Sequence, residues 1–144
     1  MAPVETETSG TLILNGSMGY IGVVDRPVRI ALRGGRIVEI EDSPSGRRLK
    51  EFLSHFHDPE NMVIAAEFGI GLNTHSHCDG NCYIEDESTY GTFHIGFGRN
   101  IALGGVQDAS GHYDLVTHTP TIYVDNRMIM DHGELTILEP LIYI

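Results

Sequence analysis

The sequence predicts one α+β domain that is rich in β-strands and extends over residues 1–144. The chain is 144 residues long, which suits a single domain with a core of its own. Several short runs alternate apolar and polar residues, and 17 glycines supply turns. Only one stretch, near residues 44–57, repeats its apolar residues at the spacing of a helix.

A β-hairpin is the clearest local prediction in the N-terminal third. Residues 28–33 and 36–41 both alternate apolar and polar side chains, and Gly34-Gly35 joins them. Two alternating runs joined by a glycine pair are typical of a hairpin. Residues 11–16 precede it and read as a strand that enters a turn.

The helix near residues 44–57 has a clear start and a clear end. Ser43 is a good N-cap residue, and Pro44 suits the first helical turn. Asp58-Pro59 is expected to end the helix, because the residue before a proline disfavours helical geometry. The apolar residues at helical spacing are Leu49, Phe52, Leu53 and Phe56.

The remainder is expected to consist of short strands and polar loops. Residues 62–68 form an apolar run that reads as a buried strand. Residues 92–97 fit a strand or a short helix, because periodicity does not separate the two in so short a run. Residues 85–88 are expected to form a helical turn. Further strands are expected at residues 115–118, 121–124, 127–130 and 136–138.

The composition bounds the partners of the chain. With 9 basic and 20 acidic residues, the formal charge is −11, which argues against nucleic acid and anionic membranes as partners. No apolar run approaches the roughly 18–20 residues of a membrane span. The first residues lack the basic and apolar regions of a signal peptide. The chain is therefore expected to be cytoplasmic, with Cys78 and Cys82 reduced.

Residues 64–114 hold most of the candidate metal ligands. Glu67 lies inside an apolar strand, where an ionised carboxylate needs a partner. A metal ion is one such partner, and the guanidinium of Arg99 is another. From the residues alone both partners remain open.

Two further segments of this stretch add imidazole and carboxylate groups. His94 alternates with Phe93 and Ile95, ahead of Gly96-Phe97-Gly98; a lone histidine there is more often a core residue with its own hydrogen bonds. In an extended segment His112 and Asp114 point to the same face of a sheet, because side chains alternate along a strand. Such a pair offers one nitrogen and one carboxylate to a metal. Together, these groups and the surrounding glycines indicate a metal site.

A rival metal site lies between residues 73 and 82. His75, His77, Cys78 and Cys82 offer two imidazoles and two thiols, which are suitable zinc ligands. Their spacing does not match a common zinc finger. We expect this segment to be a loop beside the main cluster and not a closed zinc site.

The blocks of the sequence that carry these residues follow one another in a specific order. They are Ala2-Pro3-Val4-Glu5, Gly34-Gly35-Arg36, Ala66-Glu67-Phe68-Gly69, Asp86-Glu87, Gly91-Thr92-Phe93-His94, Gly104-Gly105 and His112-Tyr113-Asp114. In order and spacing they resemble the C-terminal domain of the aminopeptidase T family, also called thermophilic metalloproteases. The resemblance covers nearly the whole chain.

The resemblance implies a metal-dependent aminopeptidase, a hydrolase that removes N-terminal residues from a peptide or small-molecule substrate. In that family two glutamates, two histidines and an aspartate hold two divalent metal ions. Matched block by block, Glu67, His94, His112 and Asp114 would be metal ligands, with zinc or cobalt as the expected ions. The resemblance also implies a homodimer, for which the largely apolar residues 138–144 offer a surface.

One ligand block of that family is missing. The family's first ligand glutamate belongs to a Pro-x-Gly-Glu-Val block upstream of Ala-Pro-x-Glu, and an N-terminal α/β domain precedes it. The chain is therefore expected to be a C-terminal portion that is a poor aminopeptidase or inactive alone. The general base is not identified, with Glu5 as a weak candidate. A non-catalytic metal-binding or assembly domain is the second hypothesis.

The enzyme 2,5-dihydroxypyridine 5,6-dioxygenase is a more distant relative on the same scaffold. It resembles this chain in its His-x-Asp pair but uses a single iron. There a histidine takes the place of Glu67 and a non-ligand takes that of His94, so these two residues favour the aminopeptidase. A set formed by His94, His112 and Asp114 would also suit ferrous iron. A ring-cleaving dioxygenase is therefore the third hypothesis.

Overall fold

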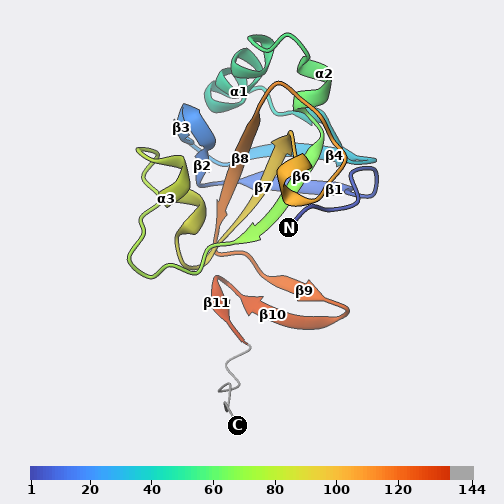
Figure 1. Ribbon diagram of the computed structural model, residues 1–144. Helices are drawn as coiled ribbons and strands as arrows, with labels where there is room; N and C mark the ends of the chain where they lie inside the picture. The colour runs from blue at the N-terminus through green and yellow to red at the C-terminus, as the bar shows by residue number, and fades with distance from the viewer. Residues whose placement is uncertain (137–144) are drawn as a thin grey trace.

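The computed structural model describes residues 1–136 and is dominated by antiparallel strands (Figure 1). The strands are β1 (Gly10–Leu14), β2 (Ser17–Met18), β3 (Gly22–Val23), β4 (Val28–Arg33), β5 (Arg36–Ile40), β6 (Ala65–Ile70), β7 (Thr92–Gly98), β8 (His112–His118), β9 (Ile122–Val124), β10 (Arg127–Asp131) and β11 (Glu134–Leu135). The helices are α1 (Pro44–Ser54), α2 (Pro59–Met62) and α3 (Tyr83–Ser88), with 3-10 turns η1 (Gly19–Ile21) and η2 (Ile101–Leu103). The predicted β-rich α+β class is confirmed.

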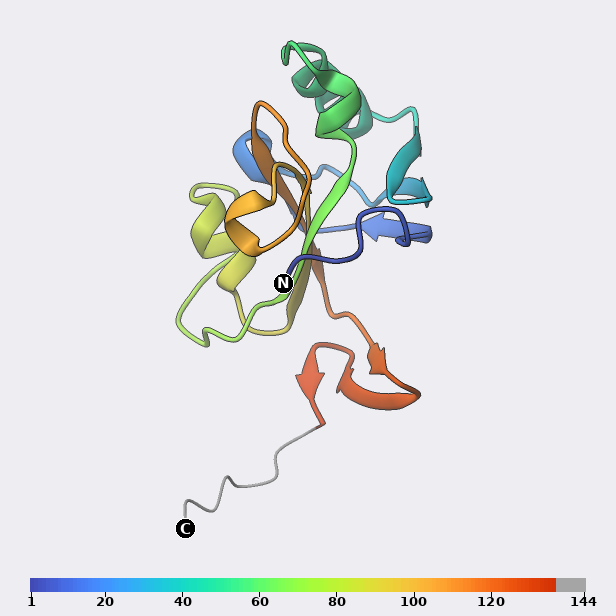
Figure 2. The ribbon, with the colours of Figure 1, turned by 45° about the vertical axis from the view of Figure 1, so that its right-hand side comes forward.

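Three sheets organise these strands. The largest has the order β3-β2-β8-β7-β6, and the second has the order β1-β4-β5. The second sheet and α1 lie on one side of the large sheet, whereas α3 and the η2 loop lie on the other (Figure 2). The third sheet, β11-β10-β9, projects from the end of the body (Figure 1). No helix within residues 1–136 is long and apolar enough to cross a membrane.

The hydrophobic core lies between the large sheet, the second sheet and α1. Alternation along β4 directs Val28, Ile30 and Leu32 into this core. From β7 and β8 it receives Phe97 and Tyr113, whose rings stack with centroids 5.6 Å apart. Tyr113 thus packs on the face opposite to its neighbours His112 and Asp114, as alternation predicts. The other face of β6, β7 and β8 is left for polar side chains.

The predicted hairpin and the start of the helix are both found. Gly34 and Gly35 join β4 to β5 with φ angles of 53° and 77°, a region that favours glycine. The Ser43 hydroxyl accepts a hydrogen bond from the Gly46 amide at 3.0 Å and caps α1. The helix ends at Ser54, not at residue 57, and Pro59 opens the short helix α2.

The C-terminal half corrects several predicted bounds. Residues 92–98 form a strand, not a helix, because β7 pairs with β6 on one side and β8 on the other. Strand β8 begins at His112, three residues earlier than predicted. The last predicted strand is displaced: β11 is Glu134–Leu135, and Thr136 is a bend. Residues 137–138, and the segment 138–144 invoked for dimerisation, lie outside the described residues.

Candidate metal centre

The candidate site is built across the three strands β6, β7 and β8. Glu67 on β6 lies opposite Gly96 on β7, and Gly96 lies opposite Asp114 on β8. Residues that pair in this way point to the same face of a sheet. Glu67 and Asp114 therefore converge from the two flanking strands over a central glycine, on the face away from the core.

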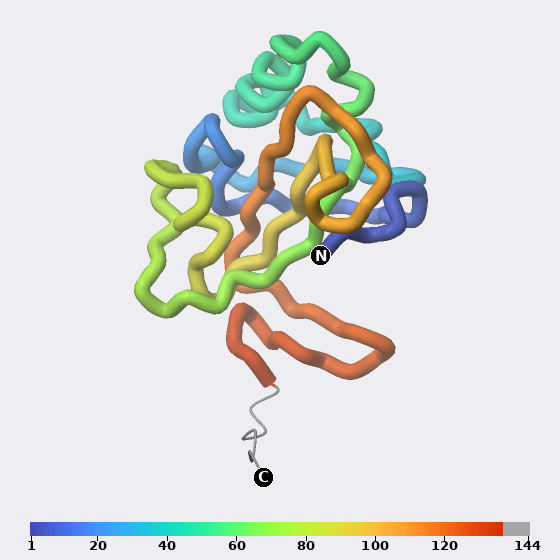
Figure 3. Tube along the Cα trace, viewed as in Figure 1, coloured from blue at the N-terminus to red at the C-terminus, as the bar shows by residue number. Residues whose placement is uncertain are grey.

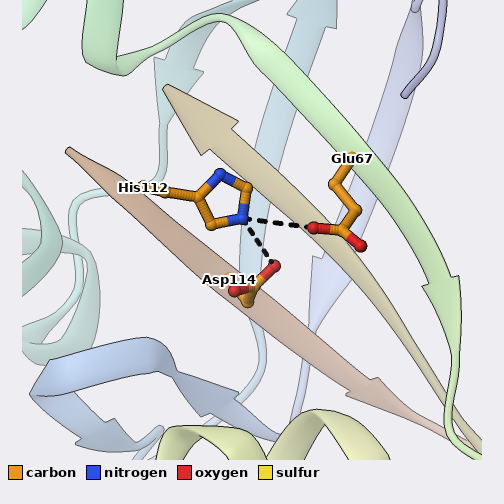
Figure 4. A group of neighbouring side chains, drawn as sticks. All are labelled: Glu67, His112 and Asp114. Carbon is orange, nitrogen blue, oxygen red and sulfur yellow. Dashed lines mark ion pairs between the residues drawn. The ribbon is translucent and has the colours of Figure 1, made fainter. Parts of the chain in front are cut away.

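His112 completes the first group of possible ligands (Figure 4). Its Nε2 lies 3.3 Å from Glu67 Oε2 and 3.5 Å from Asp114 Oδ1. The three residues offer ligand atoms that all lie within 4.8 Å of one another. The three side chains point toward one another above the sheet, so one ion could contact all of them.

A second group shares Asp114 and reaches the helix on this face. It consists of Glu87, His94 and Asp114, again with ligand atoms within 4.8 Å of one another. His94 Nε2 also lies 3.9 Å from Glu67 Oε1, which links the two groups. The structure thus brings together all four residues that the sequence suggested, although metal binding by them stays a prediction.

Glu87 is the cluster residue that the sequence reasoning missed. It lies on α3, which contacts β6, β7 and β8. Its neighbour Asp86 is fully buried and accepts hydrogen bonds from the amides of Asp79 and Gly80, at 3.1 and 3.0 Å. Asp86 therefore holds the preceding loop while Glu87 turns to the sheet. The Asp86-Glu87 block stood out in the sequence, but its spacing did not say which carboxylate would face the other ligands.

The cluster contains buried polar atoms that have no protein partner. His94 is 8% exposed and Asp114 is 4% exposed. Neither His94 Nδ1 nor Asp114 Oδ1 has a hydrogen-bond partner among the described residues. Unpaired buried polar atoms are costly, so a bound group that satisfies them is favoured. His94 is thus not the satisfied core histidine that a lone histidine in a strand more often is.

The orientation of His112 also suits a metal ligand. Its Nδ1 lies 2.8 Å from the carbonyl oxygen of Arg99. A carbonyl only accepts, so Nδ1 carries a proton and Nε2 is the atom that faces Glu67 and Asp114. The alternative partner for Glu67, the Arg99 guanidinium, instead pairs with Asp108. The donor set and its orientation therefore fit a divalent metal ion.

Two glycines leave the space that the cluster occupies. A Cβ atom on Gly96 would lie 2.7 Å from His112 Nε2 and 2.8 Å from Asp114 Oδ1. A Cβ atom on Gly69 would lie 2.1 Å from His94 Nε2. Any side chain at these two positions would push the imidazoles or the carboxylate away from their present places.

The charges of the cluster shift its pKa values in a consistent pattern. The neighbouring carboxylate of Asp114 raises the pKa of His112 to about 9, although burial acts against this. Burial and the negative charge of Asp114 raise the pKa of Glu87 to about 7. Burial also acts to raise the pKa of Asp114, but the neighbouring imidazolium of His112 outweighs it, and the pKa of Asp114 is lowered. Without a metal, protons on His112 and Glu87 balance the other carboxylates.

A pocket of about 310 Å³ opens beside Glu67 and His112. Ala102 and Leu103 of η2 line its far wall, and Arg99 and Gly111 complete it. The connection between β7 and β8 that carries η2 stands in front of the sheet (Figure 3). The pocket therefore lies between the ligand cluster and this loop, where a small organic molecule could reach a bound metal.

The weaker candidates lie elsewhere. Glu5, the weak candidate for a general base, accepts hydrogen bonds from Asn100 Nδ2 and the Val106 amide, both at 2.9 Å, and does not join the cluster. The segment before it does reach the cluster: the Met1 amino group lies 3.8 Å from Glu67 Oε1. Cys78 and Cys82 are free thiols. Neither group of possible ligands found within residues 1–136 includes them.

Fold and site together define a β-rich domain that presents imidazole and carboxylate groups on one sheet face. The chain belongs to the NicX family, described as 2,5-dihydroxypyridine 5,6-dioxygenase, whose profile matches residues 1–137. It is 24% identical over 144 residues to 2,5-dihydroxypyridine 5,6-dioxygenase of Pseudomonas putida, covering 92% of this chain and 41% of the relative. The chain thus spans about two fifths of that relative's length.

A solved structure supports the same fold. The structure of the 2,5-dihydroxypyridine dioxygenase from Pseudomonas putida matches with a TM-score of 0.84 and 21% sequence identity. The match covers 96% of this chain and 43% of that one. At this identity the likeness speaks for the fold alone.

The family match corrects the functional prediction. The chain was expected to be a hydrolase of the aminopeptidase T family, and that expectation is wrong, because the matching family is a dioxygenase family. Glu67 and His94 favoured the aminopeptidase, yet they occur here in a chain of the other family. The zinc or cobalt expected from that resemblance loses its basis with it.

Proposed function

We propose that this chain carries the metal centre of a ring-cleaving dioxygenase that acts on a dihydroxylated pyridine. The observation that carries the proposal is the cluster of Glu67, His112 and Asp114 within the stretch that the dioxygenase family matches. The unpartnered buried atoms of Asp114 and His94 support a bound ion at this place.

Glu67, His112 and Asp114 would hold ferrous iron on one side. The common facial set of non-haem iron oxygenases has two histidines and one carboxylate, and this set has a carboxylate in place of one imidazole; three ligands on one side would likewise leave positions open for other ligands. His94 and Glu87 would lie just behind them, next to Asp114. When bound, iron supplies the redox chemistry that lets dioxygen react with an aromatic ring.

The chain's own residues would bind and orient the ring. The pocket beside Glu67 and His112 has the size for one small ring, and Ala102 and Leu103 would shield it from water. Glu87 has a pKa of about 7, so near neutral pH it can hold or release a proton. Glu87 does not line the pocket, so any proton that it holds would act on the neighbouring ligand Asp114.

The test is oxygen uptake by protein reconstituted anaerobically with ferrous iron and supplied with 2,5-dihydroxypyridine. We expect uptake that tracks iron content and loss of ring absorbance, both abolished by Asp114→Asn. Iron binding without oxygen uptake would instead favour a non-catalytic metal-binding domain. Absence of iron binding would contradict the proposal altogether.

A further inference from the structure

The register between β6 and β7 contains an irregularity next to the metal cluster. On β7, Phe97 and Gly96 are consecutive, but the residues opposite them on β6 are Ala65 and Glu67. Ala66 is therefore an extra residue with no partner in the ladder. Two residues against one is the definition of a β-bulge, and bulges re-aim side chains next to functional sites.

This bulge decides which face Glu67 occupies. Residues in opposite positions share a face, and Ala65 and Phe97 are both fully buried in the core. In a regular ladder Ala66 would follow opposite Gly96, and Glu67 would then lie opposite Ile95, whose side chain belongs to the core. The extra residue moves the Glu67 carboxylate from the apolar face to the face of His112 and Asp114.

The side chain of Asn100 holds the bulge. Its Nδ2 donates to the carbonyl oxygen of Ala66 at 3.2 Å and to Glu5 Oε1 at 2.9 Å. Its Oδ1 accepts from the Gln107 amide at 2.9 Å. Asn100 is 1% exposed, so these bonds are formed away from water. One amide group thus links the bulged residue to the loop that carries η2.

The space around Asn100 is closely fitted. A Cβ atom on Gly105 would lie 2.2 Å from Asn100 Nδ2 and 2.3 Å from its Oδ1. The Asn100 carbonyl also accepts from the amides of Leu103 and Gly105, at 2.9 and 3.2 Å. The side chain therefore has few alternative positions, which suits a residue that fixes its neighbours.

We infer that Asn100 is a positioning residue for the metal centre, because it stabilises the Ala66 bulge and so keeps Glu67 directed at the metal. The inference rests on the proposed function only in that Glu67 must be a metal ligand. Asn100 itself touches neither the metal nor the pocket. Its hydrogen bonds to Ala66 and Gln107 act on the carboxylate and on the wall of the pocket.

The test uses Co²⁺ as a spectroscopic probe, since its visible absorption reports the ligand set. Asn100→Ala should weaken Co²⁺ binding about 10–100-fold, as losses of outer hydrogen bonds do, and should change the visible spectrum. Asn100→Asp keeps the acceptor for Gln107 but loses the donor to Ala66 and to Glu5, and it brings a second carboxylate next to that of Glu5. Its added negative charge would by itself favour a cation, so weaker Co²⁺ binding by this variant points to the lost hydrogen bonds and not to a change of charge.

Two comparisons make the result specific. Combined with Glu67→Gln, Asn100→Asp should cause little further loss of affinity, because both changes act on the same ligand. Asn15→Ala is the matched control. Asn15 Oδ1 accepts from Thr117 Oγ1 at 3.0 Å and the His118 amide at 2.7 Å, at the far end of β8. Asn15→Ala should lower thermal stability without changing the spectrum.

The outcomes separate the inference from the proposed function. If Glu67→Gln binds Co²⁺ like the wild type, Glu67 is not a ligand, and the inference and the assignment of Glu67 both fail. If Glu67→Gln weakens binding but folded Asn100→Asp keeps wild-type affinity and spectrum, only the inference fails. Losses that simply add in the double variant would also overturn it. Should Asn100→Ala fail to fold, Asn100→Asp alone decides.

Discussion

Substituting alanine for Gly96 should disable the metal centre while leaving the fold in place. Gly96 lies between the pairs that bring Glu67 and Asp114 together. An added Cβ would lie 2.7 Å from His112 Nε2, about 0.7 Å short of ordinary contact. His112 cannot easily yield, because its Nδ1 is held by the Arg99 carbonyl.

The expected loss of metal affinity follows from the narrow range of metal–ligand distances that a metal site tolerates. Metal–ligand distances hold within about 0.2 Å, so a shift of several tenths of an ångström costs most of a ligand's contribution. We expect metal affinity to fall about 10–100-fold, equivalent to about 1.4–2.8 kcal/mol. Crowding should lower the free energy of unfolding by about 1–3 kcal/mol.

The assay is anaerobic titration of the Gly96→Ala variant with ferrous iron, alongside thermal unfolding. Gly104→Ala is the control: Gly104 has a φ of 87°, so alanine is strained there, but nothing lies within 4 Å of its Cβ position. It should lose stability and keep its metal. Wild-type iron affinity in folded Gly96→Ala would refute the reasoning that these side chains hold the ion.

Three further outcomes are expected. Asp114→Asn should lose more metal affinity than any other single change in the cluster, because Asp114 belongs to both ligand groups. If Asp114→Asn binds iron as tightly as the other single variants in a titration, this reasoning is wrong. The metal-free protein should melt at a lower temperature as pH rises. The raised pKa of His112 stabilises the folded state fully below pH 6.5, its usual pKa, and this stabilisation is lost as the pH rises through about 9. The pKa of Glu87 is raised from its usual 4.5 to about 7, so stability from Glu87 also falls as the pH rises between these two values. A melting temperature that rises between pH 4.5 and 9 would contradict both assignments. Replacing Cys78 and Cys82 by serine should leave metal content unchanged, and loss of an ion by elemental analysis would reverse that assignment.

The sequence predicts this fold well where local chemistry decides it. Gly34-Gly35 can only serve a tight turn, and Ser43 with Pro44 marks a helix start. Helices α2 and α3 were missed or reduced to a turn because they have 4 and 6 residues. Fewer than two turns give no helical period to recognise.

Some residues of the candidate site can likewise be predicted from the sequence, and others cannot. Glu67 stands out because an ionised carboxylate in an apolar strand needs a partner. His112 and Asp114 stand out because alternation along a strand places both on one face. Glu87 does not stand out, because only packing decides whether it or Asp86 faces the sheet. The Ala66 bulge is also invisible in the sequence, since nothing in Ala65-Ala66-Glu67 signals an unpaired residue. That one residue nevertheless determines which face the carboxylate occupies.

The aminopeptidase prediction is wrong for a different reason. Glu67 and His94 favour the aminopeptidase branch in the resemblance, although the rest of the pattern is common to both kinds of enzyme. Two residues on a shared scaffold identify a ligand set better than they identify a reaction. The match over residues 1–137 is what separates the alternatives.

The most direct test of the central claim is an anomalous difference map from crystals grown with ferrous iron under anaerobic conditions. We predict one iron peak per chain, about 2.0–2.2 Å from ligand atoms of Glu67, His112 and Asp114, a typical range for divalent metals bound by nitrogen and oxygen. A peak at His75, His77 and Cys78 instead, or no iron peak at the cluster, would contradict the account.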